Sequence, residues 1–151
     1  MDEEGPYRCA HRSRIFVLSA PARAANEIQP GLWQDTESSV IDGKAEGPTI
    51  STDCVKPEDA KDPVKMIQSS LKEQSQQCKK VNVQENGNVI LFEMQCGDSN
   101  VGSIEMTMTY TFHSPRQTSS TGTTTMTMMG KKVVSTLTTE SKWLAAACDK
   151  K

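Results

Sequence analysis

The chain has few large apolar side chains, no long apolar run and no excess of one charge. Apolar residues make up 35% and aromatic residues 5% of its 151 residues, so we expect a modest core that benefits from covalent cross-links. No apolar run approaches the roughly 18 residues of a membrane-spanning helix, so we expect no transmembrane segment. The formal net charge is −2, which attracts no polyanion strongly, and we expect no nucleic-acid partner.

The sequence also lacks the short motifs that mark common active sites. It has no G-x-S-x-G elbow, P-loop, dinucleotide fingerprint or EF-hand loop. Of its two histidines, only His113 lies in the body of the chain. We therefore predict a non-catalytic protein that holds no cofactor. A hydrolase that uses His113 as its base is a weaker alternative, because a surface histidine at a strand end explains the residue more simply.

Five cysteines are present, and their spacing favours disulfides. The last four are separated by 24, 18 and 52 residues and form no C-x-x-C pair, which argues against a zinc ribbon or a thioredoxin-type dithiol. We predict two disulfides among these four and an oxidising compartment. Reduced cysteines buried in the core are the alternative. The five are Cys9, Cys54, Cys78, Cys96 and Cys148.

Hairpin geometry predicts how the cysteines pair. An Asn-Gly turn at Gly87 is a strong hairpin signal, and Cys78 and Cys96 each lie nine residues from it. They fall opposite each other in an antiparallel pair, where two Cβ atoms come close enough for a disulfide. Elimination then pairs Cys54 with Cys148.

Residues 1–25 are interpreted as a signal-like leader. Arginines precede the short apolar stretch at residues 15–18, and Ala22 and Ala24 form an A-x-A cleavage pattern. A disordered N-terminal tail is the alternative. The leader predicts a periplasmic or secreted protein, and residues 26–151 are then a single disulfide-stabilised, β-rich domain.

One segment has the period of a helix. Asp62 is a good N-cap with Pro63 at the first helical position. Val64, Ile67 and Leu71 follow at i, i+3 and i+7, which predicts one short amphipathic helix whose apolar stripe packs on a sheet.

The rest of the chain reads as strands without βαβ alternation. The fold class is therefore α+β, mainly β: a curled antiparallel sheet of about seven strands with one amphipathic helix. Residues 104–112 alternate most cleanly. The predicted strands are 32–41, 49–55, a segment through Val81 and Val83, 89–94, 104–112, 118–129 and 133–139, and residues 142–148 close the domain.

Several short motifs occur in an order that resembles one known family. The chain opens with Pro30-Gly31-Leu32-Trp33, continues with the four cysteines and the strand end Tyr110-Thr111-Phe112-His113, and closes with Lys142-Trp143-Leu144 before Cys148. In this order it is similar to the domain-of-unknown-function 3617 family of bacterial exported proteins, over about residues 27–148. The resemblance implies a secreted or periplasmic setting and retained cysteines. It implies no activity, so no catalytic residue is transferred. Ala145-Ala146-Ala147 departs from the family, which tends to have a glycine before the last cysteine.

Two methionine pairs offer candidate metal ligands. Met106 and Met108, and likewise Met126 and Met128, place two thioethers on one strand face. Thioethers favour Cu(I), so a methionine-based periplasmic copper binder is the main alternative function. Against it, Met106 and Met108 share their face with apolar neighbours, and methionine is a common gap-filler in cores.

The threonines at residues 118–127 permit an ice-binding or polysaccharide-binding interpretation. A single run is not a repeat array, and threonine favours strands in any case. A polar, solvent-facing strand is the simpler explanation.

The sequence best supports the function of a cell-envelope binding or interaction module. A curled sheet of about seven strands can enclose an apolar ligand beside a helix. An envelope protein is the alternative partner that we expect. A filled core without any cavity is the simpler alternative.

Overall fold

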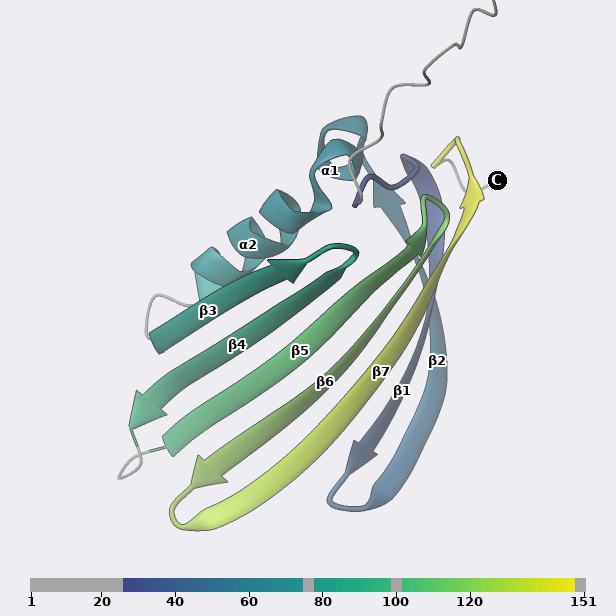
Figure 1. Cartoon of the computed structure of the whole chain (residues 1–151). Helices are drawn as coiled ribbons and strands as arrows, with labels where there is room; N and C mark the ends of the chain where they lie inside the picture. The colour runs from purple at the N-terminus through teal and green to yellow at the C-terminus, as the bar shows by residue number, and fades with distance from the viewer. Residues whose placement is uncertain (1–25, 75–77, 99–101, 149–151) are drawn as a thin grey trace, which may run out of the picture.

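Seven strands form one antiparallel sheet in the computed structural model, which describes residues 26–74, 78–98 and 102–148 (Figure 1). The strand order is β2-β1-β7-β6-β5-β4-β3, and the mainly β, antiparallel prediction is confirmed. The strands are β1 (Gly31–Ile41), β2 (Lys44–Val55), β3 (Cys78–Asn86), β4 (Val89–Asp98), β5 (Gly102–Ser114), β6 (Gln117–Met128) and β7 (Lys131–Ala145).

The sheet differs from the expected one in its curvature and in its last strand. It is not strongly curled, and β2 and β3 stay edge strands, with no pairing between them in the described residues that would close a barrel. The segment expected to close the domain after residue 139 continues β7 instead, because its backbone stays paired with β1 as far as Ala145.

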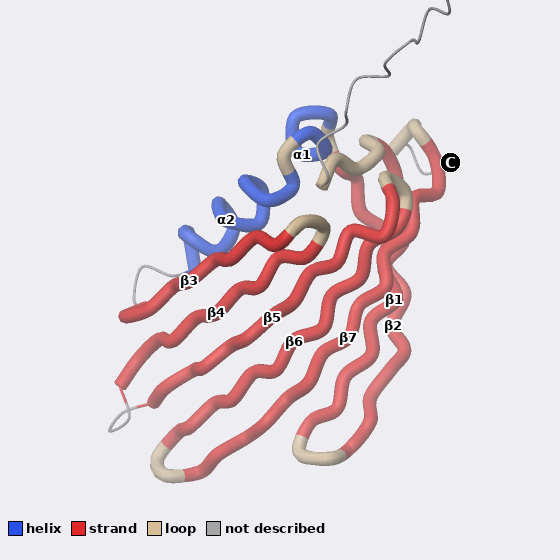
Figure 2. Tube along the Cα trace, in the orientation of Figure 1, coloured by secondary structure: helices blue, strands red, loops and turns tan. Residues whose placement is uncertain are grey.

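The described ranges contain two short helices where one was predicted, and both lie on the same side of the sheet (Figure 2). They are α1 (Pro57–Lys61) and α2 (Pro63–Gln74). The predicted start of α2 is confirmed, because the Asp62 carboxylate accepts a hydrogen bond from the Lys65 backbone N–H at 3.0 Å. The side chain of Leu71 lies outside the described part of the chain, as do residues 1–25 with the expected leader and Cys9.

The register assigns every strand residue to one of two faces, because residues opposite each other share a face and successive residues alternate. One row runs from Phe112 through Thr118 and Ser141 to Asp35. We call its side the helix-facing face, because Val64 of α2 packs against Phe112. The other side, the outer face, carries Thr107, Thr123 and Thr136 and their neighbours.

The core lies under the helices at the β4–β5 side of the helix-facing face. Val64, Ile90 and Phe112 form its buried cluster, and Ile28, Val83 and Tyr110 pack against it. Ile90 and Phe92 are both fully buried. The core is modest, as the low apolar content predicts.

Candidate functional site

The structure contains both disulfides that hairpin geometry and elimination predicted. Cys78 is bonded to Cys96 across the β3–β4 pair, and Cys54 is bonded to Cys148 over a sequence separation of 94 residues. The second bond links the end of β2 to the chain beyond β7, and these strands flank β1 on either side. Two disulfides are consistent with an exported protein.

The two tryptophans of the motifs meet beside this disulfide. Trp33 of β1 lies opposite Trp143 of β7 in the register. Their indole N–H groups donate to backbone carbonyls just before β1: Trp33 to Gln29 at 2.8 Å, and Trp143 to Pro30 at 3.0 Å. Motif residues more than a hundred positions apart therefore hold the entry of β1 against the end of β7.

Gly31 is required by the same close approach. Its φ is +129°, a conformation that side chains with a Cβ rarely adopt. A Cβ at this position would overlap the backbone carbonyl of Ala145 and contact Ala146. The Pro-Gly-Leu-Trp motif thus has a structural explanation in backbone packing.

Arg116 completes this end of the sheet. Its guanidinium carbon lies 4.6 Å from the centroid of the Trp143 ring, within the range of a cation–π contact. Its carbonyl accepts a hydrogen bond from the Trp143 backbone N–H at 3.0 Å. Lys142, the neighbouring motif residue, is exposed and lies opposite Gln34 and Gln117 in the register.

A trough of about 410 Å³ lies between the two helices and the helix-facing face. This volume is within the range of small-molecule sites, roughly 300–1,000 Å³. Aromatic and aliphatic side chains supply much of its lining. The lining residues are Ile28, Trp33, Asp35, Asp53, Cys54, Val55, Asp59, Pro63, Met66, Ile67, Tyr110, Phe112, Thr118 and Ser141.

The trough continues along the sheet beyond the helices. A second hollow of about 310 Å³ shares Asp35, Tyr110, Thr118 and Ser141 with the first and extends to Glu37, Met108, Ser119, Ser120, Leu137 and Thr139. Along the register the helix-facing face changes from apolar on β5, through hydroxyl side chains on β6 and β7, to carboxylates on β1. Along these rows the trough is therefore apolar toward β5 and acidic toward β1, and Trp33 and Val55 also line it on the β1–β2 side.

Four acidic residues contribute to the acidic side: Asp35, Glu37, Asp53 and Asp59. None of them forms an ion pair with another residue of the described ranges. Among the residues that the structure describes, no lysine, arginine or histidine lines either hollow. The acidic side thus has no cationic partner from this part of the protein.

Tyr110 lies where the two hollows meet. Its hydroxyl donates to the Met108 sulfur at 3.7 Å, and desolvation by burial raises the pKa of Tyr110 above its ordinary value of 10.0. Burial disfavours the phenolate, so the side chain presents a neutral hydroxyl to the trough.

The methionines gather on the helix-facing face more than the sequence indicated. Met94 of β4 lies directly opposite Met106. Met126 is the diagonal neighbour of Met106, because Met106 pairs with Thr124. Directly opposite Cβ atoms lie about 4.5–5.5 Å apart and diagonal ones about 7–8 Å or less. The two pairs predicted as candidates thus join one patch, with Met108 and Met128 at its ends. Met94 was missed because no second methionine stands two positions away.

His113 has a partner that sequence reasoning did not find. Its Nε2 lies 2.7 Å from the Ser119 hydroxyl oxygen, and the His113 side chain is exposed. Ser119 pairs with Thr111 and belongs to the outer face. A serine–histidine contact is the start of a nucleophile–base arrangement, but this one lies on the face opposite the helices. The hydrolase hypothesis stays a prediction.

The outer face carries a threonine array that the single run at residues 118–127 did not reveal. Successive rows across β5, β6 and β7 are Thr107–Thr123–Thr136 and Thr109–Thr121–Thr138. Cross-strand threonine pairs stabilise sheets, and threonine favours strands. Solvation of one sheet face is sufficient to explain the array.

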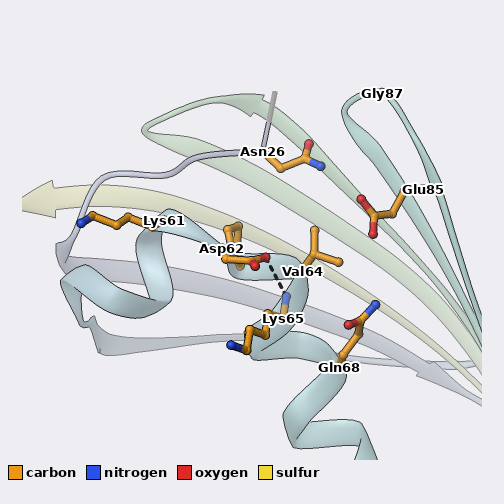
Figure 3. Close-up of a pocket in the computed structure, with 9 residues that line it drawn as sticks. Asn26, Lys61, Asp62, Val64, Lys65, Gln68, Glu85 and Gly87 are labelled. Atoms are coloured by element: carbon orange, nitrogen blue, oxygen red, sulfur yellow. Dashed lines mark hydrogen bonds between the residues drawn. The ribbon is translucent and has the colours of Figure 1, made fainter. Parts of the chain in front are cut away.

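Another open hollow of about 810 Å³ lies between α2 and the β3–β4 hairpin. Figure 3 shows Val64 and Gln68 of α2 on one side and Glu85 of β3 on the other. Its lining mixes both charges, with Lys61 and Lys65 beside Asp62 and Glu85. It has less apolar wall than the trough, so the trough is the better candidate site.

Within residues 26–74, 78–98 and 102–148, no three histidine, cysteine, aspartate or glutamate side chains are grouped to hold a metal ion. Among the helices of the same ranges, none is long and apolar enough to cross a membrane.

The comparison with protein families agrees with the motif order. Residues 28–148 match the model of DUF3617, described as a protein of unknown function. The chain belongs to the DUF3617 family. No curated protein and no solved structure matches it. In this DUF3617 member the motif residues Pro30, Gly31, Trp33 and Trp143 form the junction of β1 and β7, and Trp33 also lines the trough.

Proposed function

We propose that this DUF3617 protein is an exported, non-catalytic binding protein that holds an apolar, lipid-like ligand in the trough. The observation that carries the proposal is the trough itself: about 410 Å³ under the helices, with Trp33, Tyr110 and Phe112 in its walls. Ligand sites are concave, mostly apolar and supplied with a few polar groups. An apolar segment of an envelope protein is the other occupant that such a trough can take.

The proposed compartment rests on the disulfides. Both bonds need an oxidising environment to form and persist. Intact mass measured without reductant on protein expressed in a bacterial periplasm reports leader cleavage and thiol state together. Cleavage near residue 25 and no free thiol in the remaining chain are expected. Four free body thiols with an intact N-terminus would overturn the exported setting.

The binding proposal is tested by filling the trough. Ser141→Phe places a ring among the trough residues, whereas Glu140→Phe places the same ring on the outer face of the same strand. We expect Ser141→Phe to weaken binding of the apolar dye N-phenylnaphthylamine by at least about tenfold, and Glu140→Phe to leave it near the wild-type value.

Circular dichroism and thermal unfolding test whether both variants are folded. Should Ser141→Phe destabilise the sheet, Thr118→Leu supplies a smaller filling residue in the same trough. Equal dye binding by wild type, trough variants and Glu140→Phe would contradict the proposal, because the dye would then bind elsewhere.

A methionine-based Cu(I) binder is the second candidate, and the register favours it in one respect. Met94, Met106 and Met126 are close neighbours on one face, and three thioethers form a suitable soft ligand set for Cu(I). The double variant Met94→Leu/Met106→Leu conserves volume and should lower Cu(I) affinity in competition with bicinchoninate. Met129→Leu is the control, because Met129 is 92% exposed at a turn. Equal affinities in all three proteins would exclude this candidate.

A further inference from the structure

The trough has an acidic side as well as an apolar side, and the two lie across from each other. Tyr110 and Phe112 of β5 stand on one side, and Asp35 of β1 stands on the other in the same region of the register. Asp53 of β2 is the diagonal neighbour of Asp35, because Trp33 pairs with Asp53 and Asp35 pairs with Ser51. Asp59 reaches the same hollow from α1.

These carboxylates come from three separate elements and meet only through the fold. Within the described residues none has an ion-pair partner, and no basic side chain lines the trough. Asp35 and Asp59 are half-buried and Asp53 is exposed, and a cation beside a partly buried carboxylate is screened less by salt than one at a fully exposed carboxylate. A neutral or anionic ligand would leave that charge uncompensated or would be repelled by it.

We infer that the ligand is a cationic amphiphile: an apolar chain lying along Tyr110 and Phe112, with an ammonium or similar head group between Asp35, Asp53 and Asp59. This inference rests on the proposed function and specifies its ligand class. Charge complementarity selects the head group, and the aromatic side of the trough selects the tail. The hydroxyl residues between them, Thr118 and Ser141, provide hydrogen-bond acceptors for the ammonium.

Three probes with the same ten-carbon tail test the inference: decylammonium, decanol and decanoate, each below the concentration at which it aggregates. Binding is measured by displacement of N-phenylnaphthylamine from the disulfide-bonded protein. We expect decylammonium to bind about three- to tenfold more tightly than decanol, and decanoate to bind most weakly. The preference should shrink as salt is raised, because screening weakens the charge pairing.

Matched variants locate the charge. Asp35→Asn/Asp53→Asn removes two carboxylates with little change in shape, and the preference for decylammonium over decanol should fall to near unity. Glu140→Gln removes a carboxylate from the outer face next to Ser141 and should retain the preference.

The outcomes distinguish failure of the cationic ligand class from failure of the apolar trough as a ligand site. Equal binding of all three probes would overturn the cationic ligand and leave the apolar trough standing. Binding of none would overturn the trough as a ligand site, and the inference with it. A preference that persists in Asp35→Asn/Asp53→Asn would overturn the assignment, because the charge would then act from elsewhere.

Discussion

The two faces of the sheet share every strand and every backbone hydrogen bond, yet they have opposite characters. The helix-facing face carries Phe92 and Phe112 under the helices and the acidic trough beside them. The outer face carries rows of threonine that stay solvated. Because the backbone is common to both faces, the difference lies in the side chains and in what covers them: among the described residues, α1 and α2 cover one face, and no helix covers the other.

The helix-facing face is itself divided. Its β4 and β5 half is apolar and packs against α2, whereas in the rows through Phe112 and Tyr110 the residues of β6, β7 and β1 carry hydroxyls or carboxylates. A face that is only half covered keeps a concavity where the cover ends. In this sheet, that boundary runs through Tyr110 and Thr118, where the two hollows of the trough meet.

The largest expected contrast between the faces comes from truncating one residue on each. Phe92 is fully buried, so Phe92→Ala should lower the free energy of unfolding by about 3–5 kcal/mol. Thr107, on the outer face of neighbouring β5, is exposed, so Thr107→Ala should cost less than about 1 kcal/mol. Urea unfolding of both variants checks this. Similar costs would mean that the outer face is also packed against something.

An intermediate contrast comes from adding volume on β6. Gly122 is buried, and a Cβ there would come within 2.7 Å of the Met108 Cγ. Gly122→Val should therefore destabilise the protein by about 1–3 kcal/mol, whereas Thr123→Val on the outer face should stay within about 0.5 kcal/mol. The shift in thermal midpoint reports both. A stabilised Gly122→Val would show that the gain in strand propensity outweighs the overlap with Met108.

The smallest expected effect concerns Tyr110 and alkaline pH. Burial raises the pKa of Tyr110 in the folded protein, so above about pH 10 the unfolded chain loses this proton first. The folded state then binds more protons than the unfolded state, and the free energy of unfolding falls as pH rises further. Tyr110→Phe should remove this part of the pH dependence while changing stability little near neutral pH. Unfolding curves measured between pH 8 and about 11.5 for wild type and Tyr110→Phe test this prediction. If the free energy of unfolding depended on pH identically in both proteins, the Tyr110 hydroxyl would be solvent-exposed in the folded protein.

Much of the fold could be predicted, because its signals are local. The alternation of residues 104–112 predicts β5, Asp62 caps α2, and the turn at Gly87 predicts both the hairpin and the Cys78–Cys96 pair. These features depend on neighbours a few residues apart, where periodicity and turn chemistry are informative.

The candidate site could not be predicted, because its residues meet only through register. Asp35 and Asp53 lie in polar stretches typical of solvated strands, and Asp59 lies in the first turn of α1, where a carboxylate complements the helix dipole without any ligand. The threonine array likewise needs β5, β6 and β7 side by side in the order given by the sheet. No local sequence pattern predicts the strand order, and none predicts where the helices stop covering the sheet.

Methionine methyl groups provide the most direct test of the central claim, that the helix-facing face holds the ligand. Met66 and Met108 line the two hollows of the trough, and Met129 is exposed at the β6–β7 turn. Protein labelled with ¹³C at its methionine methyl groups is titrated with decylammonium and followed by NMR. We predict saturable shifts of the Met66 and Met108 signals and an unchanged Met129 signal. Shifts at Met129 alone, or no saturable shift at Met66 and Met108, would contradict the claim.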